Sequence, residues 1–440
     1  MKGIRSFLVL LAVLAALAGF LYYDSKREPV DGNTKEKVFA GIASDKIEGV
    51  TVKSSSGDHT TVEKQGNEWQ MTQPAAVAAD GAELSGITSN LASLEMQSVV
   101  DDQATDLKQY GLDPARIEVT FKFAGKDQKL LLGQKTPTGG DLYAKVPDKP
   151  RVFLVASYLE STFDKSTFAL RDKTILKINR EKVDRVEIET PDRTVKVAKQ
   201  GDDWRLTSPV DARADFGAVE GIIGRLNTTP MKAITAAEAT DLKEYGLDKP
   251  AATVRVMSGS AQASLAIGKS AGEGVVYAKD LSRPMVFTVE SALFDELKKP
   301  ADDFRVKDLF DARAFNTTRI EIARGGQTMA FEKEAGKDTW KQVSPSAKAA
   351  ETAKVEALLT ALSNTRATSF PDKDKIKGGT GLETPEVTVS LAFEDGKKHE
   401  KVAFARKGPD AYALRDGDAA AAKIDATALE GIFKAIDGLK

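Results

Sequence analysis

The stretch Thr105–Asp113 reads Thr-Asp-Leu-Lys-Gln-Tyr-Gly-Leu-Asp and returns at Thr240–Asp248 with one change, Gln109 to Glu244. Such a recurrence is the signature of a repeated structural unit, and it sets the register in which the rest of the chain is compared. Within the stretch, Gly111 lies where a helix needs a left-handed residue to end. We interpret the stretch as a short helical turn that ends and directs the chain into a strand. The alternative is a loop that grips a ligand.

The neighbouring residues favour the helix stop. Thr105 can cap the turn, and Asp106 suits the positive N-terminal end of a helix. Leu112 is the apolar residue that packs back after such a stop, and Pro114 cannot continue a helix. The second copy repeats this arrangement with Gly246, Leu247 and Pro250.

The three tryptophans extend the repeat to a third copy. Trp69, Trp204 and Trp340 lie 135 and 136 residues apart, and the chain has no others. Each is followed after five residues by a proline and after eleven by an acidic residue, and apolar residues then recur at spacings of three and four, as on one face of an amphipathic helix. The aligned residues are Pro74, Pro209 and Pro345; Asp80, Asp215 and Glu351; Leu84, Ile87 and Leu91; Val219, Ile222 and Leu226; and Val355, Leu358 and Leu362.

This pattern predicts one core helix in each copy, begun by Asp80 and Asp215 in the first two. Because the tryptophans keep a fixed distance in sequence from this helix, we expect them to pack against it. The alternative is that the three tryptophans form an aromatic platform that binds sugars.

Segments with the alternation of strands lie on both sides of each predicted helix. In the first copy, valine- and threonine-rich segments precede the helix, and four more strand-like segments follow the nine-residue stretch, separated by short polar turns. Short turns between strands give antiparallel pairing. The predicted fold class is therefore α+β, with three tandem copies of a mainly antiparallel, strand-rich module that has one core helix. The segments of the first copy are Ile47–Lys53, Thr60–Lys64, Trp69–Thr72, Ile117–Phe123, Gln128–Leu132, Leu142–Val146 and Val152–Val155.

The repeat divides the chain into five predicted parts. Residues 1–28 form a signal anchor or transmembrane segment, and residues 29–44 form a linker. Residues 45–177 and 178–311 are the first two modules, and residues 312–440 are a third, divergent module. A unit of this length is a domain rather than one turn of a solenoid.

The N-terminus has the features of a secretory start. Lys2 and Arg5 precede an apolar run from Phe7 to Tyr23, which is at the short end for a helix that spans a bilayer. A cleaved signal peptide with its cleavage site at Ala16–Ala18 is the alternative, but the apolar run continues beyond that site and favours an uncleaved anchor. We expect a single-pass protein of the bacterial inner membrane with most of the chain facing the periplasm; the alternative is secretion after cleavage.

Composition narrows the classes of function. The chain has 440 residues, a net charge of −2 and no cysteine. The charge gives no basic footprint for nucleic acid. The absence of cysteine excludes disulfides, thiolate metal sites and a cysteine nucleophile.

The third copy departs from the other two. Gly378–Thr380 stands where the tyrosine of the nine-residue stretch would be, and Phe404–Arg406 replaces a glycine that lies 64 residues after the tryptophan in both other copies, Gly133 and Gly268. The chain then ends in the helix-like stretch Ala426–Leu439. A module that has diverged in this way is either a structural cap or the functional specialist.

A search for reactive residues gives no constellation. The only histidines, His59 and His399, occupy non-equivalent positions, and neither has a partner at the spacing that metal binding or acid–base chemistry requires. Asp372–Asp374 begins like a calcium loop but lacks the later glycine and glutamate, and Gly378–Gly381 lacks the lysine of a phosphate loop. The acidic pairs are best explained as solvated residues: Asp101 and Asp102, Asp202 and Asp203, Asp302 and Asp303. We predict no catalytic, cofactor-binding or metal-binding residue and no cofactor.

The ordered set of motifs resembles the bacterial DUF4340 family. The set comprises the tryptophan–proline strand, the acid-led helix, Tyr-Gly-Leu-Asp, the later glycine, Tyr-Ala-Lys at Tyr143–Lys145 and Tyr277–Lys279, and Leu170–Asp172, and it covers nearly everything after residue 40. The resemblance implies one N-terminal hydrophobic segment and genes beside ABC-type transport components related to the gliding-motility system. It supplies no catalytic residues.

Three hypotheses for function follow. The first is a non-catalytic, membrane-anchored extracytoplasmic scaffold or accessory subunit of a membrane transport or envelope complex, whose partners are membrane proteins such as ABC-type transport components. The second is a periplasmic binding protein for a glycan or small envelope ligand that uses clefts between modules. The third is a hydrolase.

Overall fold

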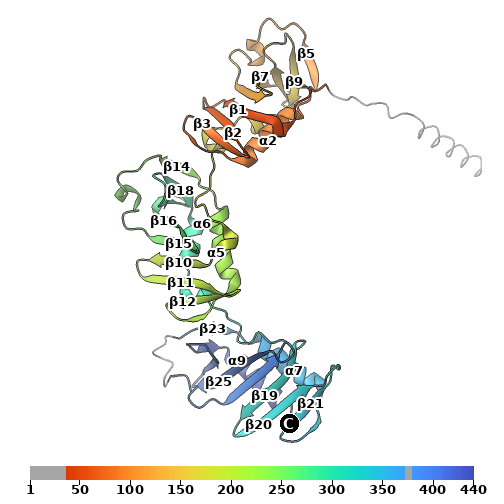
Figure 1. Ribbon diagram of the computed structural model, residues 1–440, viewed down its shortest axis with the longest axis vertical. Helices are drawn as coiled ribbons and strands as arrows, with labels where there is room; N and C mark the ends of the chain where they lie inside the picture. Colours follow the sequence, from red (N-terminus) through yellow and green to blue (C-terminus); the bar gives the residue numbers. More distant parts are fainter. Residues whose placement is uncertain (1–35, 372–378) are drawn as a thin grey trace, which may run out of the picture. The chain divides into compact units, whose positions relative to one another are not determined.

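The computed structural model describes residues 36–371 and 379–440. The chain divides after Lys173 into two compact units, of which the first contains one nine-stranded sheet and the second contains two (Figure 1). We call each sheet with its helices a module. The predicted anchor, residues 1–28, lies outside the described residues. In the described part of the chain, no helix has the length and apolar character needed to cross a bilayer.

All three sheets have the same order and are antiparallel throughout. The first runs β4-β3-β2-β1-β6-β7-β8-β9-β5, and the other two repeat this order. Its strands are β1 Ile47–Lys53, β2 His59–Gln65, β3 Glu68–Gln73, β4 Val77–Ala78, β5 Ser98–Asp101, β6 Ile117–Phe123, β7 Lys126–Lys135, β8 Asp141–Lys145 and β9 Val152–Ala156, and its helices are α2 Gly81–Ala92, α3 Leu159–Phe163 and α4 Thr167–Leu170.

The second unit holds the other two modules. The second module has β10 Arg185–Thr190, β11 Arg193–Gln200, β12 Asp203–Ser208, β13 Ala212–Arg213, β14 Ala233–Ala236, β15 Ala252–Ser258, β16 Ala261–Gly272, β17 Val275–Asp280 and β18 Val286–Glu290, with α5 Phe216–Thr228 and α6 Ser291–Leu297. The third has β19 Thr317–Arg324, β20 Gln327–Lys333, β21 Trp340–Ser344, β22 Lys348–Ala349, β23 Ala367–Ser369, β24 Val387–Phe393, β25 Lys398–Lys407, β26 Asp410–Arg415 and β27 Ala422–Ile424, with α7 Thr352–Asn364 and α9 Ala426–Asp437.

The predicted α+β class with three strand-rich modules is confirmed. Strands and core helices lie where the alternation and the three-and-four spacing place them. The outer strands of every sheet, which are only two to four residues long, were not predicted. Such short strands carry too few residues to show an alternation. The outer strands are β4, β5, β13, β14, β22 and β23.

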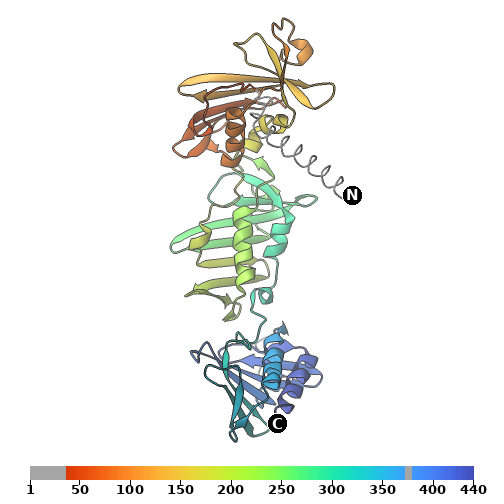
Figure 2. The ribbon, with the colours of Figure 1, turned by 90° about the vertical axis from the view of Figure 1, so that its right-hand side faces the viewer.

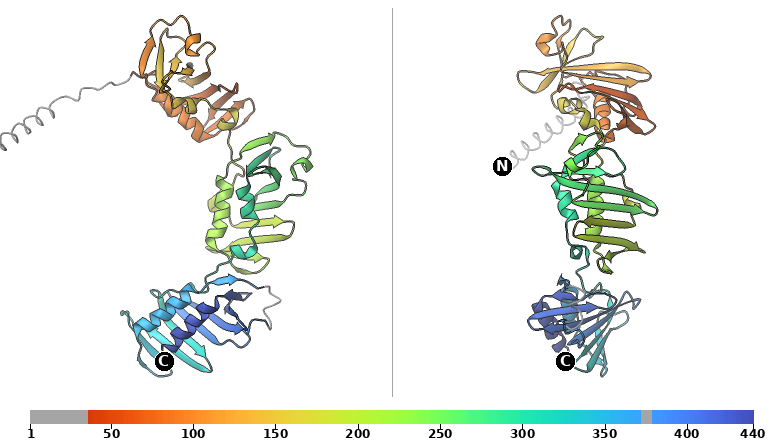
Figure 3. Two further views of the ribbon diagram at one scale, coloured as in Figure 1. Left: turned by 180° about the vertical axis from the view of Figure 1, so that it is seen from behind. Right: turned by 90° about the vertical axis from the view of Figure 1, so that its left-hand side faces the viewer.

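The core helix of each module lies on one face of its sheet (Figure 2). Asp80 accepts hydrogen bonds from the backbone N–H groups of Ala82 and Glu83, and Asp215 accepts one from Ala218, which confirms both as N-caps. In the third module, α9 packs beside α7 on the same face (Figure 3).

The tryptophans are part of the cores. Trp69, Trp204 and Trp340 are 8%, 2% and 2% exposed. Trp69 belongs to the same apolar cluster as Leu84 and Ile87 of α2, and Trp340 belongs to the corresponding cluster in the third module. The prediction that they pack against the helices is therefore confirmed, and their burial leaves no aromatic platform for a sugar. The proline that follows each tryptophan by five residues has a cis peptide bond in all three modules.

The nine-residue stretch forms the predicted helix stop. It contains a single 3-10 turn, Lys108–Tyr110 in the first copy, which ends at Gly111 with a φ of +67°. Leu107 is the N-cap of this turn and makes no side-chain capping bond, so the prediction that Thr105 caps it is wrong; the N–H of Lys108 donates to the carboxylate of Asp106 at 3.0 Å. In the second copy, Gly246 has a φ of +66°, and the N–H of Lys243 donates to Asp241 at 2.9 Å.

A short segment leads into each module and forms a bridge to a residue two or three positions after the end of the core helix. The bridges are Lys37 to Glu95, Thr174 to Pro230 and Asp308 to Arg366. Two buried apolar residues follow each bridge: Val38 and Phe39, Ile175 and Leu176, Leu309 and Phe310. The predicted linker 29–44 thus ends in residues that contribute to the first core.

The outermost strand on one edge of each sheet carries a bulge at the same place. The pairing of β5, β14 and β23 with their neighbours shifts register between Val99 and Asp101, between Ile234 and Ala236, and between Ala367 and Ser369. A bulge twists an edge away from regular pairing and so opposes the addition of another strand. These edges are poor surfaces for strand addition.

Candidate functional site

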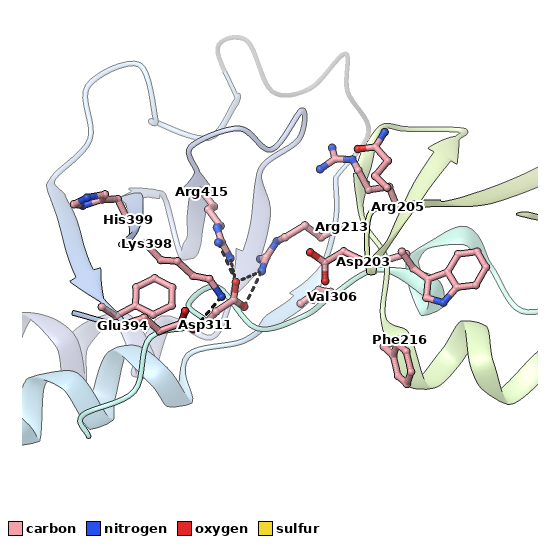
Figure 4. A pocket seen from close by; sticks show the side chains of 14 residues that line it. Asp203, Arg205, Arg213, Phe216, Val306, Asp311, Glu394, Lys398, His399 and Arg415 are labelled. Atoms are coloured by element: carbon pink, nitrogen blue, oxygen red, sulfur yellow. Dashed lines mark hydrogen bonds and ion pairs between the residues drawn. The ribbon is translucent and has the colours of Figure 1, made fainter. Parts of the chain in front are cut away.

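The second unit contains a charged cleft of about 640 Å³ that both of its modules line. β12, β13 and the start of α5 form one side, and β25, β26 and the end of β24 form the other (Figure 4). Its charged lining residues are Asp203, Arg205, Arg213, Asp311, Glu394, Lys398 and Arg415. We call this hollow the cleft.

Two arginines from different modules meet at one carboxylate in the cleft. Arg213, at the end of β13, donates from Nη1 to Asp311 Oδ1 at 3.0 Å, and Arg415, at the end of β26, donates from Nη1 and Nη2 to Asp311 Oδ2, each at 3.0 Å (Figure 4). Charge-assisted bonds of this kind are among the stronger hydrogen bonds in proteins. Asp311 therefore links the second module to the third.

Glu400 binds the backbone at Asp311 and so helps to position that residue between the two arginines. Its buried carboxylate accepts the backbone N–H groups of Asp311 at 2.9 Å and Ala312 at 3.2 Å, and lies 3.6 Å from Arg415. Burial raises the pKa of Glu400, and Asp311 adds to this effect, whereas Arg415 and the two N–H groups oppose it. The group holds the backbone of Asp311 in place while the arginines hold its side chain.

Arg213 also donates a hydrogen bond to the backbone of the segment that leads into the third module. Its Nη2 donates to the carbonyl oxygen of Asp308 at 2.8 Å, while its Nε is buried and lies 3.9 Å from Asp418, beyond hydrogen-bond distance. Burial lowers the pKa of Arg213, as does nearby Arg415, while Asp311 raises it. Among the described residues, the hydrogen bonds and ion pairs of this side chain go to the third module or to the segment that leads into it.

The other modules lack these charges at the matching positions. Nine residues after the tryptophan, where the second module has Arg213, the first has Ala78 and the third Ala349. Sixty residues after it, where the third has Glu400, the second has Ser264 and the first Lys129. Arg213, Asp311 and Arg415 were not singled out from the sequence. For Arg213, the contrast with Ala78 and Ala349 at the same distance from the tryptophan is a signal that could have found it.

The residues that the sequence analysis considered for chemistry are mostly scattered. His399 and Asp203 line the cleft, whereas His59 is exposed on β2. Asp101 accepts the N–H of Gln103, and Asp302 and Asp303 pair with Arg305 and Lys307. Asp372–Asp374 and Gly378 lie outside the described residues. Across residues 36–371 and 379–440, no group of three or more histidines and carboxylates is placed to hold a metal ion.

Two exposed phenylalanines lie beside the charged residues. Phe216, the first residue of α5, lines the cleft and is 64% exposed. Phe315, before β19, is 82% exposed and lines a second hollow, and Glu394 lines both hollows. At the position of Phe216, twelve residues after the tryptophan, the other modules have Gly81 and Thr352. Aromatic residues, including phenylalanine, are enriched at protein interfaces.

Comparison with known proteins yields a family match. The family model described as "Domain of unknown function (DUF4340)" matches residues 69–203 and 204–385. Each match begins at a tryptophan, so the unit that the family model describes starts at the third strand of one sheet and runs into the next. None of the curated proteins compared matches this chain.

Solved structures give only distant likenesses. The DNA polymerase sliding clamp from Pseudomonas aeruginosa is 8% identical, with 87% of this chain and 91% of that chain covered, at a TM-score of 0.17. The DnaN sliding clamp of the same organism bound to griselimycin is 9% identical, with 88% and 92% covered, at 0.16. Transferrin binding protein B from Neisseria meningitidis is 10% identical, with 83% and 59% covered, at 0.07. Scores this low carry no conclusion.

Proposed function

The chain belongs to the family described as "Domain of unknown function (DUF4340)", and we propose that it acts without catalysis, as a membrane-anchored extracytoplasmic scaffold or accessory subunit of a membrane transport or envelope complex. One observation carries this proposal. The motifs that the modules share are used in internal packing, whereas Arg213 and Phe216, which the other modules lack at the matching positions, lie on the charged and aromatic surface of the second unit.

The motifs that the modules share pack against one another within each of the first two modules. Tyr110 of the nine-residue stretch lies against Tyr143 of Tyr-Ala-Lys, with ring centroids 5.0 Å apart, and Tyr245 and Tyr277 repeat this at 5.1 Å. Lys145, the last residue of that motif, is buried and donates to the carbonyl of Lys149 in the following turn. Because these side chains are engaged in ring packing and internal hydrogen bonds, their role is structural. This supports a scaffold more than an enzyme.

The proposed contact surface is the one around the cleft. The bulged sheet edges oppose strand addition, whereas Phe216 and Phe315 present apolar side chains to solvent near charged groups. Large aromatic residues surrounded by polar ones are typical anchors of protein interfaces. The proposed partners are membrane proteins such as ABC-type transport components, reached from an anchor in residues 1–28.

Crosslinking and affinity capture from native membranes test this function. The full chain is compared with a form that lacks residues 1–28. The scaffold hypothesis predicts that the full chain captures a defined set of membrane proteins and that the shortened form loses them. Capture of the same set by the shortened form in the soluble fraction would contradict a role that depends on the membrane.

A binding protein for a glycan or small envelope ligand is the second candidate, because the cleft has the volume of a small-molecule site. Its lining is strongly charged, and the arginines Arg213 and Arg415 already pair with Asp311. A ligand of the cleft would raise the melting temperature of residues 29–440 in proportion to the logarithm of its concentration. A panel of envelope glycans that leaves the melting temperature unchanged would reject this candidate for those ligands.

A further inference from the structure

The junction segment, residues 305–312, leads from the second module to the third and is bonded along its length. At its start, Arg305 bridges to Ala214, and the N–H of Val306 donates to the carbonyl of Arg213 at 3.1 Å. The next residue, Lys307, already belongs to the third module, since its carbonyl accepts the N–H of Ala367 at 2.7 Å. No free length of chain separates the two modules, so any change in their orientation must turn about the bonds between Val306 and Lys307.

Side chains add a second connection across that point. Arg213 reaches from the second module to Asp311, which Arg415 holds from the third. Arg305 reaches in the same direction, with its guanidinium carbon 3.4 Å from the centroid of the Phe370 ring. Rotation about residues 306 and 307 would therefore have to separate Arg213 from Asp311.

We propose that the triad Arg213–Asp311–Arg415 is an ionic lock that fixes the orientation of the third module on the second. The proposal goes beyond the scaffold function and does not depend on it. The lock is releasable because the Asp311 side chain is 51% exposed, whereas those of Arg213 and Arg415 are 21% and 14% exposed. Ion pairs that water reaches are screened by salt, so the lock should loosen as ionic strength rises.

The members of the lock are not held equally, so the structure indicates which of them separates when the lock opens. Glu400 and the backbone bonds keep Asp311 and Arg415 together within the third module, and Arg213 is the only member that the second module contributes. Opening therefore breaks the bonds that Arg213 makes with Asp311 and Asp308, and it also separates Arg305 from the Phe370 ring. The carboxylate of Asp311 stays neutralised by Arg415 in the opened form, which lowers the cost of opening compared with that of a buried, isolated pair.

Spin-label distance measurements on the full chain in detergent test the lock. The chain has no cysteine, so exposed Asn227 on α5 and Glu356 on α7 can be replaced by cysteine and labelled without background. The lock predicts one narrow distance distribution at low salt. It predicts that Arg213→Met and Asp311→Asn each increase the population of other orientations about two- to five-fold, the size expected for loss of a partly exposed pair.

Three controls make the result decisive. Arg205→Met removes an arginine of the same cleft that pairs with Asp211 of its own module, at 2.7 Å, and should leave the distribution narrow. Sodium chloride at molar concentration should broaden the unmodified chain but add nothing to Arg213→Met. Unchanged melting temperatures show that the variants are folded. A distribution that stays narrow in folded Arg213→Met and Asp311→Asn, or that broadens equally in Arg205→Met, overturns the proposal.

Discussion

The carbonyl oxygen of Tyr110 lies so close to Gly133 that a β-carbon on that glycine would stand 2.0 Å from it. The second module repeats the contact between Tyr245 and Gly268, at 2.1 Å. In the first two modules, the glycine that lies 64 residues after the tryptophan is therefore the point at which the helix stop contacts the sheet. The ladder between β7 and β8 shifts register at the same point.

Alanine at Gly133 is expected to destabilise the first module by about 1 to 3 kcal/mol or more, because backbone atoms on both sides must move to make room. Chemical unfolding of Gly133→Ala measures this loss. Gly140→Ala is the matched control, since a β-carbon there meets nothing within 4 Å. Equal stability of the two variants would show that the contact is not tight.

The third module shows what happens when the pair is absent. It lacks the tyrosine, it has Ala405 one residue beyond the position of the glycine, and the ladder between β25 and β26 is regular from Val402 to Lys407. The tyrosine carbonyl contact, the glycine and the register shift thus occur together in the first two modules and are all absent from the third. The divergence that the sequence displays at Phe404–Arg406 is a local structural change, and it is separate from the charged residues of the cleft.

The N-caps give a second prediction. Asp215 accepts the N–H of Ala218 at 2.8 Å, whereas Glu351, at the same position in the third module, makes no such bond. Asp215→Ala should therefore cost about 0.5 to 2 kcal/mol of unfolding free energy. Glu351→Ala should cost much less, because it removes only an exposed pair with Lys354. Similar losses in both variants would contradict this account of the helix starts.

A third prediction concerns acid. Burial opposes ionisation of Asp80, but its hydrogen bond and ion pair with Lys173 and the N–H groups of Glu83 and Ala82 outweigh this effect and lower its pKa. A carboxyl whose pKa is lowered in the folded state contributes stability above its unfolded pKa, and that contribution is lost as pH falls through the folded value. Asp80→Asn keeps a capping side chain and removes the charge.

We therefore expect the stability difference between the unmodified chain and Asp80→Asn to be present at neutral pH and to vanish in strong acid. Urea unfolding of the first module at a series of pH values below 5 measures it. A difference that stays constant across this range would mean that the charge of Asp80 contributes nothing.

Much of the fold could be predicted because the pattern of each helix or strand occurs in up to three aligned copies, which can be compared with one another. The spacing of Leu84, Ile87 and Leu91 and the alternation of Ile47–Lys53 are periodic signals that local packing enforces. The two- to four-residue outer strands and the burial of Val38 and Phe39 could not be predicted, because they depend on contacts with distant segments. The cleft was missed for the same reason, since Arg213, Asp311 and Arg415 are ordinary surface charges until the chain is folded.

Residues shared among the modules build the fold, and we propose that unshared residues around the cleft recognise partners. Affinity capture from native membranes with the double variant Phe216→Ser and Phe315→Ser tests this claim most directly. Leu281→Ser, which changes another exposed apolar residue of the second unit, is the control. The account predicts that the double variant keeps its melting temperature and loses its membrane partners while the control keeps both. Undiminished capture by the folded double variant would contradict it.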